Sequence, residues 1–292
     1  MFDLTYISKL GETLDLAHNP LFWLTNVDGM TNAATDISAN VIGGQDGDDI
    51  NNIQAQPRPI ILDLLVDYSQ NVEDVKRSIL RIIKLKQPCV LRWVQNNRTW
   101  EINGVVDGIT MPRFSNSVTM QVSIHCEDPY WHDIHDTISE IAESIGMQYF
   151  TDTPGDMLYF PDGGIPFGEV NTSRTRSMLN DGDVSVGMII EIVALKTVTN
   201  PIIYNAAGDF IGIGHTNNIV RKLVMSAGDV LVINTNTGEK SVTLNGVSQL
   251  DKIKPHSTWL QLEAGENELT VNSDDAETDN LVFTVTYRQK YI

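Results

Sequence analysis

The stretch Val90–Trp131, VLRWVQNNRTWEINGVVDGITMPRFSNSVTMQVSIHCEDPYW, decides how the first half of this chain folds. From Val118 to Cys126 apolar residues alternate with polar ones, and this period of two places every apolar side chain on one face of a strand. Upstream, the polar segment Gln95–Arg98 separates two partly apolar runs, which is typical of a hairpin. Pro112 interrupts the pattern, because proline donates no ladder hydrogen bond. The stretch therefore predicts an antiparallel meander with one solvent-facing side.

Elements before the meander complete a first domain, which we expect over residues 1–132. Arg58–Val66 has the apolar alternation of a strand, and Asn71 is placed to cap a helix that Pro88 ends. The apolar stripe of this helix consists of Val72, Val75, Ile79, Ile82 and Ile83. Together with short strands near the N-terminus, these elements predict an α+β fold for this domain.

The segment Asp28–Pro59 is poor in large apolar side chains and rich in Gly, Asn, Asp, Thr and Ala. We interpret it as a long loop that carries one strand, Asp36–Ile42. Loops of this length are usually functional or form an interface. Its Gly43–Asp49 portion lacks the order of ligands in an EF-hand loop, so we expect a solvated turn and no calcium site.

The composition changes after Trp131, and the chain from residue 183 onward is expected to be all-β. The spacing of Ile134, Ile138, Ile141 and Ile145 predicts a short helix ended by Gly146, and residues 147–183 are interpreted as an irregular linker. We therefore expect a helix and a linker over residues 133–182, between the two domains. Short strands at spacings near ten residues, including Met188–Leu195 and Trp259–Leu262, then predict a β-sandwich over 183–292.

The formal net charge of −18 argues against tight binding of nucleic-acid phosphates. The charge is uneven, because residues 58–132 hold nine basic and eight acidic residues while residues 133–292 hold ten and 22. The nearly neutral segment is a plausible self-association surface. No apolar run approaches the roughly 20 residues of a membrane helix, and the N-terminus lacks the pattern of a secretory signal. We therefore expect no membrane contact, and we expect assembly to take place in a cytoplasm.

Motifs for chemistry are weak throughout the chain. There is no G-x-S-x-G, no H-E-x-x-H and no phosphate-binding glycine loop, so we expect no catalytic residues and no cofactor. His132 and His135 have a spacing that could bring two imidazoles together, but zinc needs three or four ligands, so we expect no metal site. Cys89 and Cys126 are expected to be reduced thiols acting as small apolar residues.

A sugar site in the sandwich is the open alternative from another functional class. Exposed aromatic rings beside polar groups bind saccharides, and Trp259 with His256 and Gln261 is the best candidate for such a site. Leu260 and Leu262 flank Trp259 closely and favour a core position for its ring. A glycan-binding module that contacts host cell-wall saccharides therefore remains the second hypothesis.

The order of several motifs resembles that of phage distal tail proteins, the hub proteins at the tip of long phage tails. In the first domain the similar segments are Gly44–Gly47, Arg58–Ile60, the helix from Asn71, Leu91–Trp93 and Asp128–Trp131. In the second they are Leu179–Asp183, Asn200–Asn205, Gly228–Val230, Ser241–Gly246, Trp259–Leu262, Ala264–Asn267 and the last strand to Arg288. No single motif is specific, whereas their order along the chain is.

The resemblance implies a hexameric ring of first domains and a galectin-like sandwich as the second domain, facing outward. It implies that the ring joins the tail tube protein to the tail-associated or tail fibre hub protein and anchors receptor-binding proteins at the virion tail tip. The candidate interface residues are Asp46, Asp48, Asp49, Arg58, Arg92 and Trp93. The acids of the Gly44–Asp49 turn are expected to face the lumen of the ring.

Overall fold

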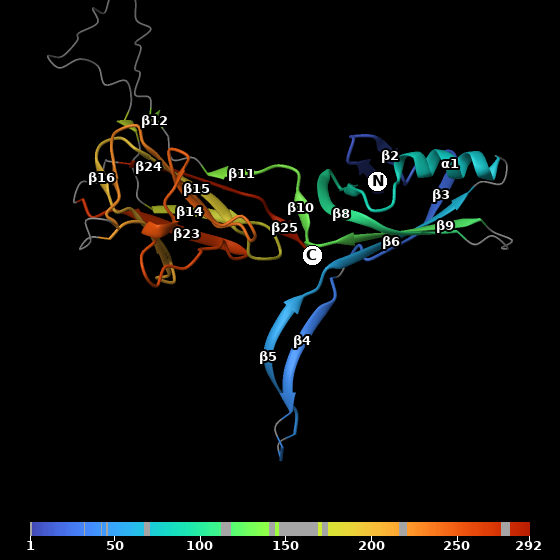
Figure 1. Cartoon of the computed structure of the whole chain (residues 1–292), viewed down its shortest axis with the longest axis horizontal. Helices are drawn as coiled ribbons and strands as arrows, with labels where there is room; N and C mark the ends of the chain where they lie inside the picture. The colour runs from blue at the N-terminus through green and yellow to red at the C-terminus, as the bar shows by residue number, and fades with distance from the viewer. Residues whose placement is uncertain are drawn as a thin grey trace, which may run out of the picture. The chain divides into compact units, whose positions relative to one another are not determined.

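The structure, a computed structural model, divides into two compact units (Figure 1). The first consists of Met1–His135 with Lys290–Ile292, and the second of Asp136–Gln289, so the second unit is inserted into the chain of the first. The described residues are 2–31, 33–41, 43–44, 46–66, 71–111, 118–139, 144–145, 169–170, 175–215, 221–275 and 281–292.

A nine-stranded antiparallel sheet forms the body of the first unit. Its strand order is β2-β1-β7-β8-β9-β6-β3, and β10 pairs with both β8 and β25. The strands are β1 (Phe2–Ser8), β2 (Thr13–Asp15), β3 (Phe22–Asp28), β6 (Arg58–Val66), β7 (Pro88–Gln95), β8 (Arg98–Thr110), β9 (Thr119–Cys126), β10 (Trp131–Asp133) and β25 (Lys290–Tyr291).

The predicted meander is confirmed in strands β7, β8 and β9. In β9 the burial alternates residue by residue from Met120 to Cys126, as a period of two requires. Strands β7 and β8 meet at a two-residue turn in which Asn96 and Asn97 have φ angles of 52° and 63°. Positive φ at both central residues is the type I′ geometry, whose twist matches that of the strands it joins.

Helix α1 (Val72–Ile82) is also confirmed, including its cap. The side chain of Asn71 accepts a hydrogen bond of 3.2 Å from the Glu73 amide, which satisfies one free donor of the first turn. Val75 and Ile79 are buried in the same cluster as residues of β6 such as Leu64. The helix therefore packs its apolar stripe on the core of the first unit.

The interpretation of residues 28–59 as a loop with a single strand is wrong. Strands β4 (Thr35–Val41) and β5 (Asp48–Ala55) pair only with each other and form a separate two-stranded ribbon (Figure 1). The sequence of β5, DDINNIQA, is mostly polar, and a bulge between Ser38 and Ala39 shifts the register. Both features remove the alternation by which a strand is recognised. The expected strand end at Ile42 lies outside the described residues.

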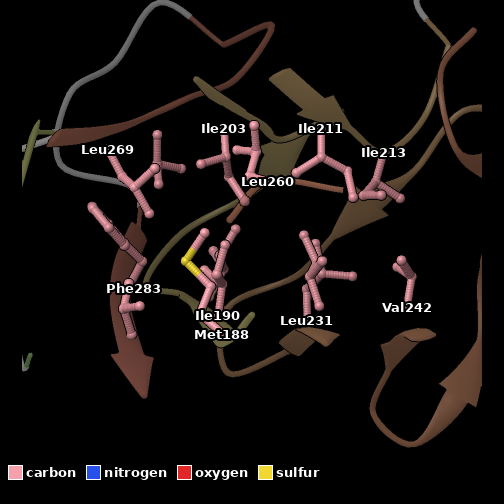
Figure 2. Packing of buried hydrophobic residues seen from close by; sticks show 14 of the residues in the cluster. Met188, Ile190, Ile203, Ile211, Ile213, Leu231, Val242, Leu260, Leu269 and Phe283 are labelled. Carbon is pink, nitrogen blue, oxygen red and sulfur yellow. The ribbon is translucent and has the colours of Figure 1, made fainter. Parts of the chain in front are cut away.

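Two antiparallel sheets of the second unit share one core. The six-stranded sheet has the order β11-β24-β15-β20-β21-β22, and the four-stranded sheet has the order β14-β23-β17-β18. Met188 and Phe283 from the first sheet lie in the same buried cluster as Ile203 and Leu269 from the second (Figure 2). The strands are β11 (Thr137–Ser139), β14 (Thr175–Asn180), β15 (Met188–Ala194), β17 (Ile202–Asn205), β18 (Phe210–Gly212), β20 (Val230–Asn234), β21 (Ser241–Leu244), β22 (Val247–Ser248), β23 (Gly265–Asn272) and β24 (Leu281–Tyr287).

Smaller elements complete the second unit. Strands β12 (Ser144–Ile145) and β13 (Glu169–Val170) form one pair, and β16 (Val198–Thr199) and β19 (Val224–Met225) form another. The expected strand Trp259–Leu262 is wrong, because Leu262 makes only an isolated bridge with Val186.

The helix predicted after Trp131 is wrong. Thr137–Ser139 form β11 at the edge of the six-stranded sheet, and Ser144–Ile145 form β12. A helix this short is marginal unless tertiary packing supports it, and the side chain of Ile138 is 57% exposed and lacks such packing. Pairing with β24 satisfies the backbone instead. Ile141 of the predicted stripe, and Gly146, which was expected to end the helix, lie outside the described residues.

The segment interpreted as an irregular linker contains regular structure at its end. Strand β14 pairs with β23 over all six of its residues. Apart from β13 and residues 175–183, the linker lies outside the described residues. No helix in the described part of the chain is both long enough and apolar enough to cross a membrane.

Candidate assembly surfaces of the first unit

An aromatic cluster stabilises the hairpin of β7 and β8. The ring centroids of Trp93 and Trp100 lie 4.7 Å apart, and that of Trp131 in β10 lies 5.5 Å from Trp93. Tyr291 of β25 packs edge-on against Trp100 at 6.0 Å. Aromatic pairs at these separations add to the free energy gained from burial alone. The cluster therefore anchors the hairpin and the last strand of the chain in one core.

The base of the β4–β5 ribbon is held by a carbonyl group that accepts two hydrogen bonds. The Met30 oxygen accepts from Nη1 of Arg58 at 3.0 Å and from Nε1 of Trp131 at 3.1 Å. Next to it, Gly29 has φ of 84°, and a Cβ there would collide with the Pro59 carbonyl oxygen. The chain thus enters and leaves the ribbon through a tightly packed crossing.

Arg58, a candidate interface residue, is completely buried, so its guanidinium is not exposed on the surface of the first unit. Burial lowers the pKa of this group, although nearby Cys126, Tyr130 and Asp128 act in the opposite direction. Its Nε and Nη2 atoms have no hydrogen-bond partner in the described part of the chain. The contribution of Arg58 to an interface is therefore to fix the ribbon base.

The ribbon exposes an apolar face that nothing in the described part of the first unit covers. Ile37, Ile50 and Ile53 are 56%, 54% and 61% exposed. Ile37 lies opposite Ile53, and Ile50 lies opposite Ala39, so all four side chains share one side of the ribbon. An isolated two-stranded hairpin is marginally stable in water. These isoleucines were missed in the sequence because polar neighbours separate them, and their only signal is that they interrupt a polar stretch.

The six candidate interface residues lie in three places. Asp46, Asp48 and Asp49 are exposed at the tip of the ribbon and at the start of β5. Arg58 lies at the ribbon base, as described above. Arg92 lies in β7 and pairs with Glu101 of β8, with Nη2 to Oε1 at 2.6 Å. Trp93 is half-buried in the aromatic cluster. The structure thus joins the three acids into one patch and separates them from β7.

Asp128 connects the last strand of the chain to the end of the meander. Its Oδ2 lies 3.0 Å from Nε2 of His132 and 2.7 Å from Nζ of Lys290. Burial would raise the pKa of Asp128, but hydrogen bonds from His132 and Lys290 outweigh it and hold the pKa well below its usual range.

The backbone amide of His135 donates to Asp133 at 2.9 Å. No group of three or more His, Cys, Asp or Glu residues suited to a metal occurs among the described residues.

A pocket of about 460 Å3 opens between β1, β7 and β8, with Lys9, Cys89, Asn103 and His125 in its lining.

Both thiols of the chain are free and buried. Burial raises the pKa of Cys89 to about 11 and that of Cys126 to about 12. Because a thiol must ionise to act as a nucleophile, neither cysteine is reactive at neutral pH.

The three sugar-site candidates of the second unit do not form an open aromatic platform. Trp259 is half-buried and packs against the core, and Nζ of Lys240 lies 5.8 Å from the centre of its ring. Gln261 accepts a hydrogen bond of 3.2 Å from the Ser185 hydroxyl. His256 is exposed in a turn with φ of 64°. The ring of Trp259 therefore packs against the core, and the ammonium group of Lys240 lies over it.

Comparisons with known proteins find similarity to phage tail components. Residues 181–291 match the family model of the siphovirus-type tail component, C-terminal domain. Among curated protein sequences, none matches this chain.

Among solved structures, the Dit protein of phage SPP1 is similar, with a TM-score of 0.66, 14% identity and coverage of 100% of both chains. Its structure is described as a paradigm of the hub adsorption apparatus in phages that infect Gram-positive bacteria. A chain of the phage p2 baseplate in its activated conformation with strontium gives a TM-score of 0.46 at 10% identity, covering 98% of each chain. Only the match to SPP1 Dit has a TM-score above 0.5, and at 14% identity it shows a shared fold.

Proposed function

We propose that this chain, whose residues 181–291 are a siphovirus-type tail component domain, is the structural hub of a phage tail tip. The domain match is the observation that carries the proposal, and the fold shared with SPP1 Dit along the whole chain supports it. In this role the protein sits at the virion tail tip and has no catalytic task. It joins the tail tube protein to the tail-associated or tail fibre hub protein and holds receptor-binding proteins.

The hub is a ring of six copies joined through their first units. The exposed isoleucine face of the β4–β5 ribbon supports this assembly, because a marginally stable hairpin with an apolar side gains stability when a neighbour covers it. In a closed ring each copy uses two different surfaces, so growth stops at a fixed number. Asp46, Asp48 and Asp49 lie on the ribbon and belong to this interface, whereas Arg92 and Trp93 are the weaker candidates.

The second unit is a galectin-like sandwich that presents a surface for receptor-binding proteins. Direct binding of cell-wall saccharides is the alternative, but the half-buried Trp259 with Lys240 over its ring offers no free aromatic platform. A glycan array probed with the full chain separates these two roles. The hub proposal expects no saccharide signal above that of an unrelated acidic protein.

Negative-stain microscopy with native mass spectrometry tests the hub itself. The full chain is examined alone and mixed with its tail tube protein, because tail partners can template the ring. The proposal expects sixfold rings in at least the mixture, carrying the mass of six copies. Monomers under both conditions, over a concentration series into the high micromolar range, would contradict it.

A further inference from the structure

We propose that the β4–β5 ribbon of one copy docks on the C-terminal half of helix α1 in a second copy of this chain. This inference rests on the proposed ring and names the two surfaces that meet in it. The first unit carries one surface that is acidic and apolar, and another that is basic with an exposed leucine. Neither surface is covered by the described residues of its own unit.

One acid of the ribbon shares the side of its isoleucines, whereas the neighbouring Asp49 lies on the other side. Side chains two residues apart on a strand share a face, so Asp48 lies on the side of Ile50, and the pairing of Ile37 with Ile53 extends that side. Seven residues of strand extend about 23 Å at 3.3 Å per residue. The ribbon is therefore long enough to reach across the surface of a neighbouring copy.

The complementary surface lies at the end of helix α1 and in the turn that follows it. Arg77, Arg81 and Lys86 are exposed, Lys84 is half-buried, and Leu85 between the two lysines is half exposed. None of these four cations has an ion pair in the described part of the chain. Four unpaired positive charges within ten residues, with an apolar side chain among them, are complementary to the exposed acids at the end of the ribbon and to its isoleucines.

Among the described residues, the other cations of the first unit are engaged, apart from Lys9. Arg58 is buried, Arg92 pairs with Glu101, and Lys290 pairs with Asp128. Lys76 lies 3.9 Å from Glu73, and Arg98 has a partner of its own. Among the described residues of this unit, the end of α1 is therefore the surface where unpaired positive charge concentrates.

Opposite potentials select the partner surface and set its orientation, while the isoleucines supply apolar area. Because ribbon and helix are different surfaces, each copy gives its ribbon to one neighbour and receives the ribbon of another. Such a heterologous contact closes into a ring when its rotation fits. The docking thus supplies the kind of contact that the proposed ring requires.

Cysteine cross-linking between two differently labelled full-length variants tests the contact even if rings are scarce. Asp48→Cys is mixed with Arg81→Cys and treated with a short bismaleimide, to which the buried Cys89 and Cys126 are inert. We expect cross-linked heterodimers at least tenfold above those formed by Asp48→Cys mixed with Lys9→Cys. Equal yields in the two mixtures would overturn the docking and favour a ribbon tip that faces the lumen.

Charge reversal gives a second, independent test. Asp48→Lys with Asp49→Lys, or Arg77→Glu with Arg81→Glu, should each lower the hexamer yield in native mass spectra at least tenfold. A chain that carries all four changes should recover most of it. Lys9→Glu and Asp107→Lys are matched controls on exposed sites and should leave the yield unchanged. Hexamers insensitive to all reversals would overturn the docking and leave the hub intact, whereas cross-links without hexamers would refute the ring alone.

Discussion

The two β-hairpins of the first unit, β7–β8 and β4–β5, have opposite sources of stability. The β7–β8 hairpin lies inside the nine-stranded sheet, turns at Asn96–Asn97 and packs Trp93 and Trp100 into an aromatic cluster. The β4–β5 hairpin pairs with no other described strand and leaves its isoleucines in solvent. One hairpin is stabilised by its own unit, and the other has to find its apolar contacts in another molecule.

This difference separates folding from assembly within a single unit. Changes in the β7–β8 hairpin should alter the free energy of unfolding of the isolated chain. Changes in the β4–β5 hairpin should leave that free energy nearly constant and alter association. The following predictions are ordered by the size of their expected effect on unfolding.

Replacing Trp131 by alanine should have the largest effect. Its side chain is fully buried against Trp93 and donates a hydrogen bond to Met30, so its loss leaves a cavity and removes one of the two hydrogen bonds that this carbonyl accepts. We expect a loss of about 3–5 kcal/mol in urea unfolding. Trp23→Ala, on the exposed edge strand β3, is the matched control and should cost far less. Equal losses would mean that the aromatic cluster does not stabilise the unit.

Gly104→Ala should overpack the sheet where β8 passes β9. A Cβ at this position would lie 2.6 Å from Cγ2 of Ile124 and 3.0 Å from Sγ of Cys126. We expect a loss of about 1–3 kcal/mol in thermal or urea unfolding. Gly108→Ala is the control on the same strand, because its Cβ would meet Ser123 at an ordinary 3.6 Å. A neutral Gly104→Ala would show that this packing relaxes freely.

Asn97→Ala should weaken the β7–β8 turn by about 1 kcal/mol, because alanine tolerates the left-handed region less well than asparagine. Asn97→Gly keeps that conformation accessible and should be neutral or stabilising. Differential scanning calorimetry of both variants measures the effect. If the two substitutions destabilise equally, the φ angle of Asn97 is not what fixes the turn.

Asp128 should make the first unit sensitive to acid. Its folded pKa is depressed, so its contribution to stability is present above the unfolded value of about 3.9 and is lost as the pH falls through the folded pKa. Its carboxylate is partly exposed, so solvent screening keeps the contribution near or below about 1 kcal/mol. Urea unfolding of Asp128→Asn should differ from wild type at pH 7, and the difference should shrink as the pH falls below the unfolded pKa of about 3.9. A constant difference at all pH values would exclude this titration.

Ile53→Ser should have the smallest effect on unfolding and a large effect on assembly. Because the side chain is mostly exposed, we expect the free energy of unfolding to change by less than about 0.5 kcal/mol. The hexamer yield should fall at least tenfold in native mass spectra. Asn52→Ser, on the opposite face of β5, is the control. A clearly destabilised Ile53→Ser monomer would mean that the ribbon is part of the folded core.

The sequence predicts those elements whose stability is local or follows a simple period. The alternation of β9, the Asn71 cap of α1 and the turn at Asn96–Asn97 each have a direct physical signal, and each is confirmed. Strand β5 was missed because its sequence is mostly polar and a bulge interrupts its alternation, so only its pairing with β4 reveals it. The isoleucine spacing after Trp131 suggested a helix, whereas pairing of β11 with β24 decides the conformation there.

The candidate interface residues differ in how much of their placement the sequence reveals. Acidic Asp46, Asp48 and Asp49 were identified by their place in a long polar segment, and they lie together on the ribbon. The sequence gives no sign that Arg58 is buried, because only the folded chain shows that its guanidinium lies inside and donates to the Met30 carbonyl. Ile37 and Ile53 become a surface only when the register of the ribbon sets them opposite each other.

Hydrogen exchange of the full chain, measured before and after ring assembly, tests the central claim most directly. In the free chain, amides of β4 and β5 should exchange fast and those of β7 and β8 slowly, since only the latter belong to the sheet. In the ring, we predict that protection of β4 and β5 rises at least tenfold while β7 and β8 stay unchanged. Ribbon amides that are already protected in the free chain, or that remain unprotected in the ring, would contradict the account.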